Sequence, residues 1–325
     1  MQLDRISHLN FYEPTTFSAT TGIHNMSIKN VCLLGANGTV GPMVLHALVN
    51  DGFNVTVLKR ASSKSPTDYP AGVKVAEVND AFAVDDLVPI FSNQDAVVVT
   101  IKGTQVDIQK RLADAAVKAG VKRFIPADFG SCDSSSPHAQ DCVPLFANKT
   151  ELRSYLADLA RENKGFTWSS IVCGHFFDWA TAFLHIWPRE KRADLVKPGD
   201  QLKASYSTLA RVGEVTSRIL QRPAETANRV LFVQSFCVTQ VAIVQAFEKA
   251  SGAKYDVRWL QAESYEHEQK AKRDEGDKEA IENLVWMLGA IEGNWEEREE
   301  FAMGVLGLEN ENLEKVAERV VQSGC

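Results

Sequence analysis

One turn constrains the fold of this chain more than any other stretch: residues 35–41, Gly-Ala-Asn-Gly-Thr-Val-Gly. A mostly apolar run over 28–34 precedes the turn and predicts a buried strand. The residues that follow, 42–50, predict a helix, because Pro42 suits a first helical turn and Asp51-Gly52 suits a helix end. The glycines therefore stand between a strand and a helix, which is the context that gives a glycine-rich motif its meaning.

The spacing of the three glycines predicts a turn that binds phosphate groups. The first allows the tight turn, the second lets the backbone approach a pyrophosphate, and the third lets helix and strand pack closely. The free N–H groups and the positive dipole end of the helix favour the same anion. Two other interpretations are a turn whose glycines serve packing only and, for Asn37-Gly38-Thr39, a glycosylation acceptor. The residues expected to contact the pyrophosphate are Gly35, Asn37, Gly38, Thr39, Val40 and Gly41.

Strands and helices alternate regularly after this turn. Strands are expected over 28–34, 54–59, 73–78, 95–101, 121–126 and 166–173, and helices over 42–50, 85–91, 105–119 and 145–164. This alternation predicts an α/β protein with a doubly wound parallel sheet, the NAD(P)-binding Rossmann fold. The expected organisation is an N-terminal extension over 1–27, a nucleotide-binding domain over 28–173, and a smaller, mainly substrate-binding lobe over 174–325, with a strand near 229–236 that returns to the sheet.

Composition excludes several classes of protein. The net charge of −7 over 325 residues argues against a nucleic-acid binder with a broad basic face. No apolar run has the length of a membrane span, and residues 1–27 lack the apolar core of a secretory signal, so we expect a cytoplasmic protein. A small-molecule substrate is the expected partner, and the sequence leaves open whether the protein forms a homodimer. Cys132, His138 and Cys142 lie close in sequence, but their spacing matches no zinc pattern, so no metal is expected.

The end of the second expected strand indicates the cofactor. NAD enzymes place a carboxylate there for the ribose hydroxyls, whereas NADP enzymes place arginine for the 2′-phosphate. Here the strand end and the loop after it carry Lys59, Arg60 and Lys64, and no carboxylate occurs before Asp68. Arg60 can bind a phosphate through two hydrogen bonds. The alternative is a solvated basic loop, but the pattern favours NADPH, bound by Arg60 and Lys64.

The usual catalytic pair of a short-chain dehydrogenase is missing. None of the tyrosines has a lysine four residues later, so the Tyr-x-x-x-Lys acid is absent from the sequence. In the corresponding region stands Phe146-Ala147-Asn148-Lys149. Considered alone, Lys149 is either a surface lysine near a helix start or a group that meets a substrate oxygen.

Three stretches resemble the NmrA-like, isoflavone-reductase-like family of atypical short-chain dehydrogenases. They are the turn over 35–41, the run over 121–130, and Lys149 followed by Arg153. The family includes pinoresinol–lariciresinol and phenylcoumaran benzylic ether reductases, and the overall character is nearest to its CipA-like fungal oxidoreductases. Two departures leave the substrate open: the family's usual Ser-Glu-Phe-Gly stands here as Ala-Asp-Phe-Gly over 127–130, and its paired arginines are reduced to Arg153-Ser154.

The resemblance implies an NADPH-dependent reductase of a small aromatic or enone-like metabolite. It implies that Lys149 is the catalytic lysine, which also contacts the cofactor, that Phe129 lies beside the nicotinamide, and that Ile101, Lys102 and Gly103 line the dinucleotide. The family also implies a rival interpretation, a regulatory protein that senses NAD(P) without catalysis.

An aromatic cluster follows the sixth expected strand: His175, Phe176, Phe177 and Trp179. In a parallel sheet, ligands lie beyond the carboxyl ends of the strands. These four residues are therefore expected to shape the substrate pocket. The alternative is that they form ordinary core, with His175 as a satisfied core histidine.

Overall fold

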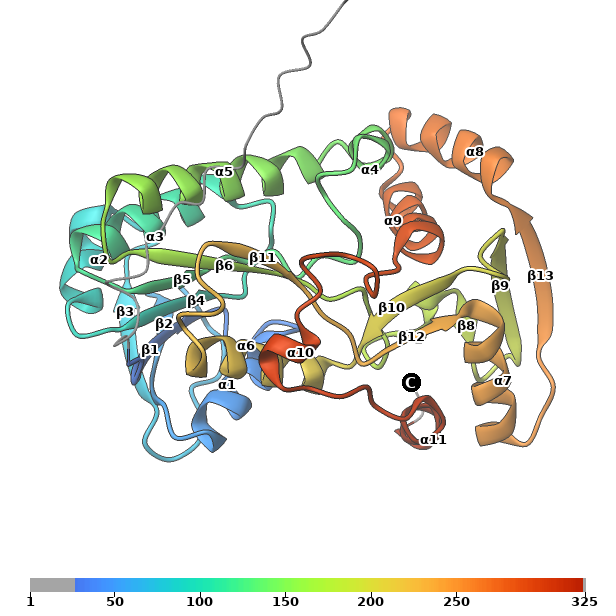
Figure 1. The fold of residues 1–325 in the computed structure, drawn as a ribbon, viewed down its shortest axis with the longest axis horizontal. Helices are drawn as coiled ribbons and strands as arrows, with labels where there is room; N and C mark the ends of the chain where they lie inside the picture. Colours follow the sequence, from blue (N-terminus) through green and yellow to red (C-terminus); the bar gives the residue numbers. More distant parts are fainter. Residues whose placement is uncertain (1–26, 324–325) are drawn as a thin grey trace, which may run out of the picture.

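The fold is described by a computed structural model over residues 27–323. Its centre is a seven-stranded parallel sheet of order β11-β6-β5-β4-β1-β2-β3, which confirms the predicted fold class (Figure 1). The strands are β1 (Asn30–Leu34), β2 (Asn54–Arg60), β3 (Lys74–Val78), β4 (Ala96–Val99), β5 (Arg123–Ile125), β6 (Thr167–Val172) and β11 (Arg229–Phe232). The expected extension lies outside the described residues except for Ser27.

Helices cover both faces of this sheet, so its central strands read as continuous apolar runs. The four residues of β4, for example, are all buried. One face carries α2 (Val84–Phe91), α3 (Val106–Lys118) and α5 (Phe146–Glu162); the other carries α1 (Gly41–Asn50) and α6 (Leu209–Gln221) (Figure 1). The apolar side chains form a separate core cluster under each layer.

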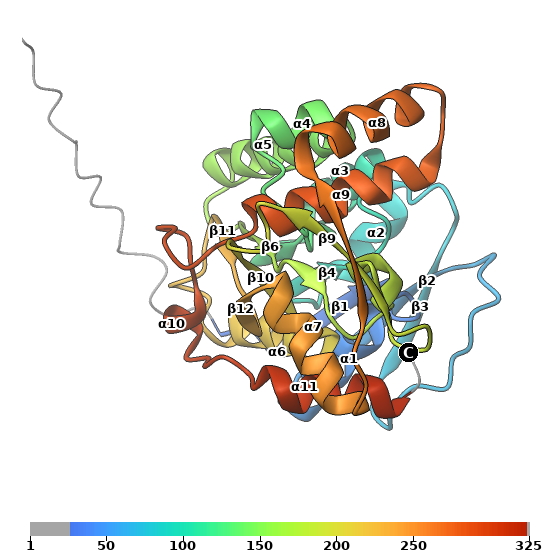
Figure 2. The same ribbon diagram turned by 90° about the vertical axis from the view of Figure 1, so that its right-hand side faces the viewer.

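Two small sheets form the rest of the molecule. One has the order β12-β10-β7 and the other β13-β9-β8. Their strands are β7 (His175–Phe176), β8 (Ile186–Trp187), β9 (Arg192–Lys197), β10 (Lys203–Ser207), β12 (Phe236–Thr239) and β13 (Asp256–Gln261). The helical elements around them are α4 (Pro137–Cys142), η1 (Thr181–Leu184), α7 (Gln240–Ser251), α8 (Ala262–Asp274), α9 (Lys278–Glu292) and α11 (Leu313–Ser323) (Figure 2). The short helix α10 (Met303–Leu306) packs against α6 of the large-sheet layer instead.

The structure changes two of the expected elements. The strand expected over 229–236 is divided: β11 joins the large sheet beside β6, whereas β12 pairs with β10 in a small sheet. The segment between the strand expected over 121–126 and the helix expected over 145–164 contains a short helix, α4, whose start is capped by Ser136. None of the helices between residues 27 and 323 has the length and apolar character needed to cross a membrane.

Arg123 on β5 is a fully buried cation that meets neutral acceptors. Its guanidinium donates to the hydroxyls of Thr167, Ser169 and Thr226 at 2.9, 2.8 and 2.9 Å, and to the carbonyl of Pro223 at 2.5 Å. Burial lowers the pKa of Arg123 to about 10. The side chain thereby ties β5 and β6 to the segment that leads into β11.

Candidate active site

The glycine turn has the shape that its sequence predicts, because side chains do not fit at two of its positions. Gly35 has φ of +94°, and a Cβ there would lie 2.7 Å from the Thr100 hydroxyl. A Cβ on Gly41 would lie 2.1 Å from the carbonyl oxygen of Gly35. Gly38 N donates to that carbonyl at 2.9 Å and closes the turn. A larger residue at 35 or 41 would force the strand and the helix apart.

The first turn of α1 is open to an anion. Val40 occupies the N-cap position without a side-chain hydrogen bond, and no acidic residue stands in the first turn. The amide groups of a helix start attract negative charge when neither a cap nor a carboxylate occupies them. Thr39, which is exposed, and buried Val40 lie at this end of the helix. The turn and helix therefore fit a pyrophosphate.

A groove of about 270 Å³ runs along the turn. It is bounded by the glycine turn, the ends of β2 and β4, the loop after β2 and the start of α3. The residues that line it include Gly35, Asn37, Gly38, Lys59, Arg60, Ser63, Tyr69, Asp80, Phe82, Ile101, Gln105 and Ile108. Apolar walls at Phe82, Ile101 and Ile108, beside polar groups at its mouth, suit the adenosine part of a dinucleotide.

Of the expected cofactor residues, Arg60 lines the groove. Lys64 and Lys102 are exposed and are not among the residues that line it. Lys59 is buried and donates from Nζ to the carbonyl of Ser65 at 2.7 Å, so it holds the loop after β2. Asn37 also holds this loop, because its side-chain amide donates to Pro66 O at 2.9 Å and Tyr69 Oη at 3.1 Å.

Asp80 is a groove residue that the sequence interpretation missed. It follows β3, and its carboxylate accepts hydrogen bonds from the backbone N–H and the hydroxyl of Ser62. The Ser62 hydroxyl, aided by the charge of Arg60, lowers the pKa of Asp80. The signal that could have found it is its position: a polar residue just after a parallel strand lies at the ligand-binding edge of the sheet.

Lys149 lies in the first turns of α5 with its side chain 17% exposed. Its Nζ donates to the backbone carbonyl of Asp128 at 2.7 Å and lies 3.4 Å from Oδ1 of the same residue. A Cβ on Gly103 would lie 3.6 Å from Lys149 Cε, and one on Gly130 would lie 3.6 Å from Nζ. The lysine is therefore held between two loops at the end of β4 and β5, and is no free surface residue.

Asp128 is the second residue that sequence reasoning missed. Its carboxylate is buried, with Oδ2 accepting from Arg153 Nε at 2.6 Å and from the Ser170 hydroxyl. Burial alone would raise the pKa of Asp128, but the charges of Arg153 and Lys149 and the Ser170 hydrogen bond outweigh burial and lower it. The next residue, Phe129, has φ of +36°, a left-handed backbone that non-glycine residues seldom adopt.

The aromatic cluster divides into core and surface. Phe177 is fully buried and packs against Phe236 and Phe247 at ring distances of 4.9 and 5.7 Å, so it belongs to the core. The expectation that it lines a pocket is corrected by this packing. Phe176 is half-buried and meets Trp179 edge to face at 6.4 Å, and Trp179 is 42% exposed.

His175 is a buried histidine of the C-terminal half. Its Nε2 lies 3.3 Å from the backbone carbonyl of Trp286 on α9. Burial lowers the pKa of His175 to about 4, so the ring is neutral near pH 7. The second interpretation of the sequence, a satisfied core histidine, describes this geometry better than a substrate contact.

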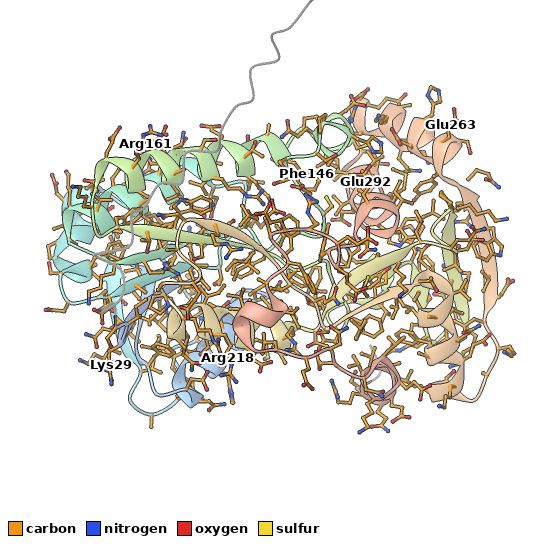
Figure 3. The ribbon with its side chains drawn as sticks, in the orientation of Figure 1. Lys29, Phe146, Arg161, Arg218, Glu263 and Glu292 are labelled. Atoms are coloured by element: carbon orange, nitrogen blue, oxygen red, sulfur yellow. The ribbon has the colours of Figure 1, made fainter. Side chains whose placement is uncertain are left out.

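His138 and Cys142 come together with Glu266 of α8, and not with Cys132. Their ligand atoms lie within 4.8 Å of one another, a spacing that could hold a metal ion. The acidic partner already has protein donors, because Lys270 Nζ lies 2.6 Å from Glu266 and His138 Nε2 lies 2.9 Å from it. His138 also contacts Glu292 through Nδ1, so this cluster joins α4 to α8 and α9. Figure 3 marks Glu292 at the end of α9 and Phe146 at the start of α5.

These features define a class: a Rossmann-fold protein with a groove along its glycine turn and a partly buried lysine at the same edge of the sheet. Residues 27–289 match the NmrA-like family, and the chain belongs to this family.

Three known proteins illustrate the likeness. The oxidoreductase aprR of Aspergillus flavus is 31% identical over 303 residues, which cover 91% of this chain and all of that protein. The solved structure of AtPrR2 with NADP+ and (+)pinoresinol has a TM-score of 0.74 at 19% identity, covering 90% of this chain and 99% of that one. The leucoanthocyanidin reductase–NADPH complex from Vitis vinifera has a TM-score of 0.70 at 17% identity, with 90% and 99% covered. The chain is thus an oxidoreductase homologue with the fold of these reductases.

Proposed function

We propose that this protein is an NADPH-dependent reductase of a small aromatic or enone-like metabolite, with Lys149 as its general acid. The observation that carries the proposal is the loop after β4. Ile101 lines the nucleotide groove, and Gly103, two residues later, borders Lys149. A dinucleotide with its pyrophosphate on the glycine turn is therefore led toward the lysine.

Arg60 supports NADPH as the cofactor, because it lines the groove and its guanidinium can bind a 2′-phosphate through two hydrogen bonds. Asp80 lies on the same side but is bound to Ser62, so it supports the loop that carries the basic residues. That AtPrR2 and leucoanthocyanidin reductase were solved with NADP+ and NADPH agrees with this assignment.

NADPH bound in this groove would supply the hydride. The acceptor carbon, once reduced, leaves negative charge on a substrate oxygen, which needs a proton or a fixed positive charge. Lys149 can give that proton from Nζ, or hold a water or substrate hydroxyl that gives it. The Lys149 side chain is 17% exposed, which limits the access of bulk water to its amino group.

Phe176 and Trp179 are the residues we assign to the substrate. They are the members of the aromatic cluster that remain accessible, and they meet each other edge to face. Planar apolar rings favour an aromatic or conjugated substrate through stacking and through burial of apolar area. The pinoresinol bound to AtPrR2 is a ligand of this kind.

A substrate screen that follows NADPH absorbance, with aromatic ketones and enones, tests the proposal. With a substrate in hand, Lys149→Ala should lower kcat by about 10²–10⁴-fold while NADPH binding by calorimetry stays near that of the unmodified protein. Lys149→Arg should not restore the rate, because arginine keeps its proton. A hydride-transfer rate unchanged in Lys149→Ala, measured in a single turnover, would refute the role of the lysine.

A second candidate function is a sensor of NAD(P) without catalysis. One observation favours it: no tyrosine of the sequence has a lysine four residues later, so the usual acid of a short-chain dehydrogenase is missing. Tight NADPH binding with no oxidation across the whole substrate screen would select the sensor.

A further inference from the structure

We propose that Asp128 is a positioning residue, the carboxylate that fixes the amino group of Lys149 in the site and stabilises its positive charge. The inference rests on the proposed function in that Lys149 is taken as the general acid. Its evidence is the arrangement of atoms around the lysine, which is independent of any substrate.

Asp128 meets Lys149 with two different oxygens. Its backbone carbonyl accepts the Nζ hydrogen bond at 2.7 Å, and its Oδ1 lies 3.4 Å from the same nitrogen. Oδ1 is buried and has no hydrogen-bond partner of its own. The second carboxylate oxygen is taken by Arg153 and Ser170. One oxygen thus anchors the carboxylate to the protein, and the other is left facing the lysine.

The charges at this centre do not balance without Asp128. Lys149 and Arg153 are two cations with side chains 17% and 10% exposed, and both pair with the one carboxylate. Two thiols also feel the charge of Lys149, those of Cys132 and Cys173, but burial raises the pKa of each to about 12 and keeps both neutral. Asp128 therefore supplies the negative charge that makes a half-buried ammonium favourable.

The backbone at this point supports the same role. Phe129 adopts φ of +36°, and a Cβ on Gly130 would lie 3.5 Å from Asp128 Oδ1 and 3.6 Å from Lys149 Nζ. A strained backbone persists when the surroundings hold it in place. The bonds from Arg153 and Ser170 to the Asp128 side chain hold this turn, and the turn aims the Asp128 carbonyl at Lys149.

The test compares Asp128→Asn with Asp128→Glu. The amide keeps the size of the side chain but removes the negative charge beside the ammonium, so Lys149 should lose its proton at a lower pH than in the unmodified protein. Asp128→Glu keeps the charge and should leave the titration close to that of the unmodified protein. Because Asp128→Asn leaves Arg153 unpaired and can impair folding, the double variant Asp128→Asn/Arg153→Gln removes that second charge as well, and should show the same direction.

Competitive labelling with acetic anhydride over a range of pH, read by mass spectrometry of the peptide that contains Lys149, reports the titration without turnover. A lower midpoint in both neutral variants, restored in Asp128→Glu, supports the inference. Equal midpoints in all four proteins overturn it. If the protein turns over a substrate, the basic limb of its pH–rate profile should move together with the labelling midpoint. If the labelling midpoint moves in the variants but the unmodified protein reduces no substrate, the proposed function is refuted and the pairing of Asp128 with Lys149 stands.

Discussion

Gly289 of α9 lies directly against the imidazole of His175: a Cβ at position 289 would be 2.1 Å from Nε2. The histidine is buried, its ring lies 6.2 Å from that of Tyr206, and its Nε2 lies 3.3 Å from the Trp286 carbonyl of α9. A helix that packs this closely on a small sheet needs glycine at the contact.

Gly289→Ala should therefore lower the free energy of unfolding by about 1–3 kcal/mol through overpacking. The better helix propensity of alanine offsets part of the strain, by about 1 kcal/mol. Urea denaturation measures the change. Gly304→Ala is the matched control, since a Cβ there meets no atom within 4 Å. Equal stability of the two variants would show that α9 moves away at no cost.

Cofactor choice depends on Arg60. A hydrogen bond to a charged group contributes roughly 1.5–3 kcal/mol, so Arg60→Ala should weaken NADPH binding by about 10- to 150-fold. NADH binding should barely change, because NADH lacks the 2′-phosphate, and it serves as the control ligand in the same calorimetric titration. Equal affinity of the unmodified protein for both cofactors would contradict the assignment.

The aromatic cluster offers a comparison between surface and core. Trp179→Ala should raise KM for an identified substrate while the unfolding free energy changes by under about 1 kcal/mol, because this side chain is 42% exposed. Phe177→Ala should cost about 3–5 kcal/mol, as a fully buried phenylalanine does. A loss of stability in Trp179→Ala with normal KM would place Trp179 in the core instead.

His138 predicts a dependence of stability on pH. The hydrogen bond to Glu292 raises the pKa of His138 above its ordinary 6.5, and Glu266 adds to the effect against partial burial. Because folding raises the pKa of His138, its ion pairs add to the free energy of unfolding. This contribution is fully present below the pKa of the unfolded state and is lost as the pH rises through the pKa of the folded state. Glu266, whose pKa is lowered, keeps its charge over this range.

The measurement is the unfolding free energy of the unmodified protein and His138→Gln at pH 6 and pH 9. The difference between the two proteins should be larger at pH 6. His267→Gln, the same substitution at an exposed position of α8, should show no such dependence. If the difference in unfolding free energy between the unmodified protein and His138→Gln were larger at pH 9 than at pH 6, the ion pairs of His138 would be refuted.

The sheet could be predicted from the sequence because its signals are local. The run before Gly35, the glycine spacing and the alternation of strands with helices each lie within a few residues of one another. Local signals also explain why the strand expected over 229–236 was too long. β11 and β12 follow one another closely along the chain, and only their partner strands reveal that they belong to two sheets.

The missed residues are those whose role depends on distant partners. Asp128 was visible as a departure from a family motif, yet its meaning comes from Arg153 and Ser170, 25 and 42 positions away. Asp80 enters the groove because β3 lies beside β2, which no spacing along the chain encodes. His175 reads as a pocket residue until α9, more than a hundred positions later, covers it.

Arg123 has a consequence for how the protein is made. Arg123 bonds to Pro223 and Thr226, and β6 pairs with β11, so the guanidinium and the strand each lack part of their partners until residues 223–232 have emerged from the ribosome. During that interval the nascent chain presents an open strand edge beside a cation whose final acceptors have yet to be synthesised. The large sheet is complete only after residue 232 has left the exit tunnel, and a chain stalled before that point would carry its glycine turn on a sheet that lacks its last strand.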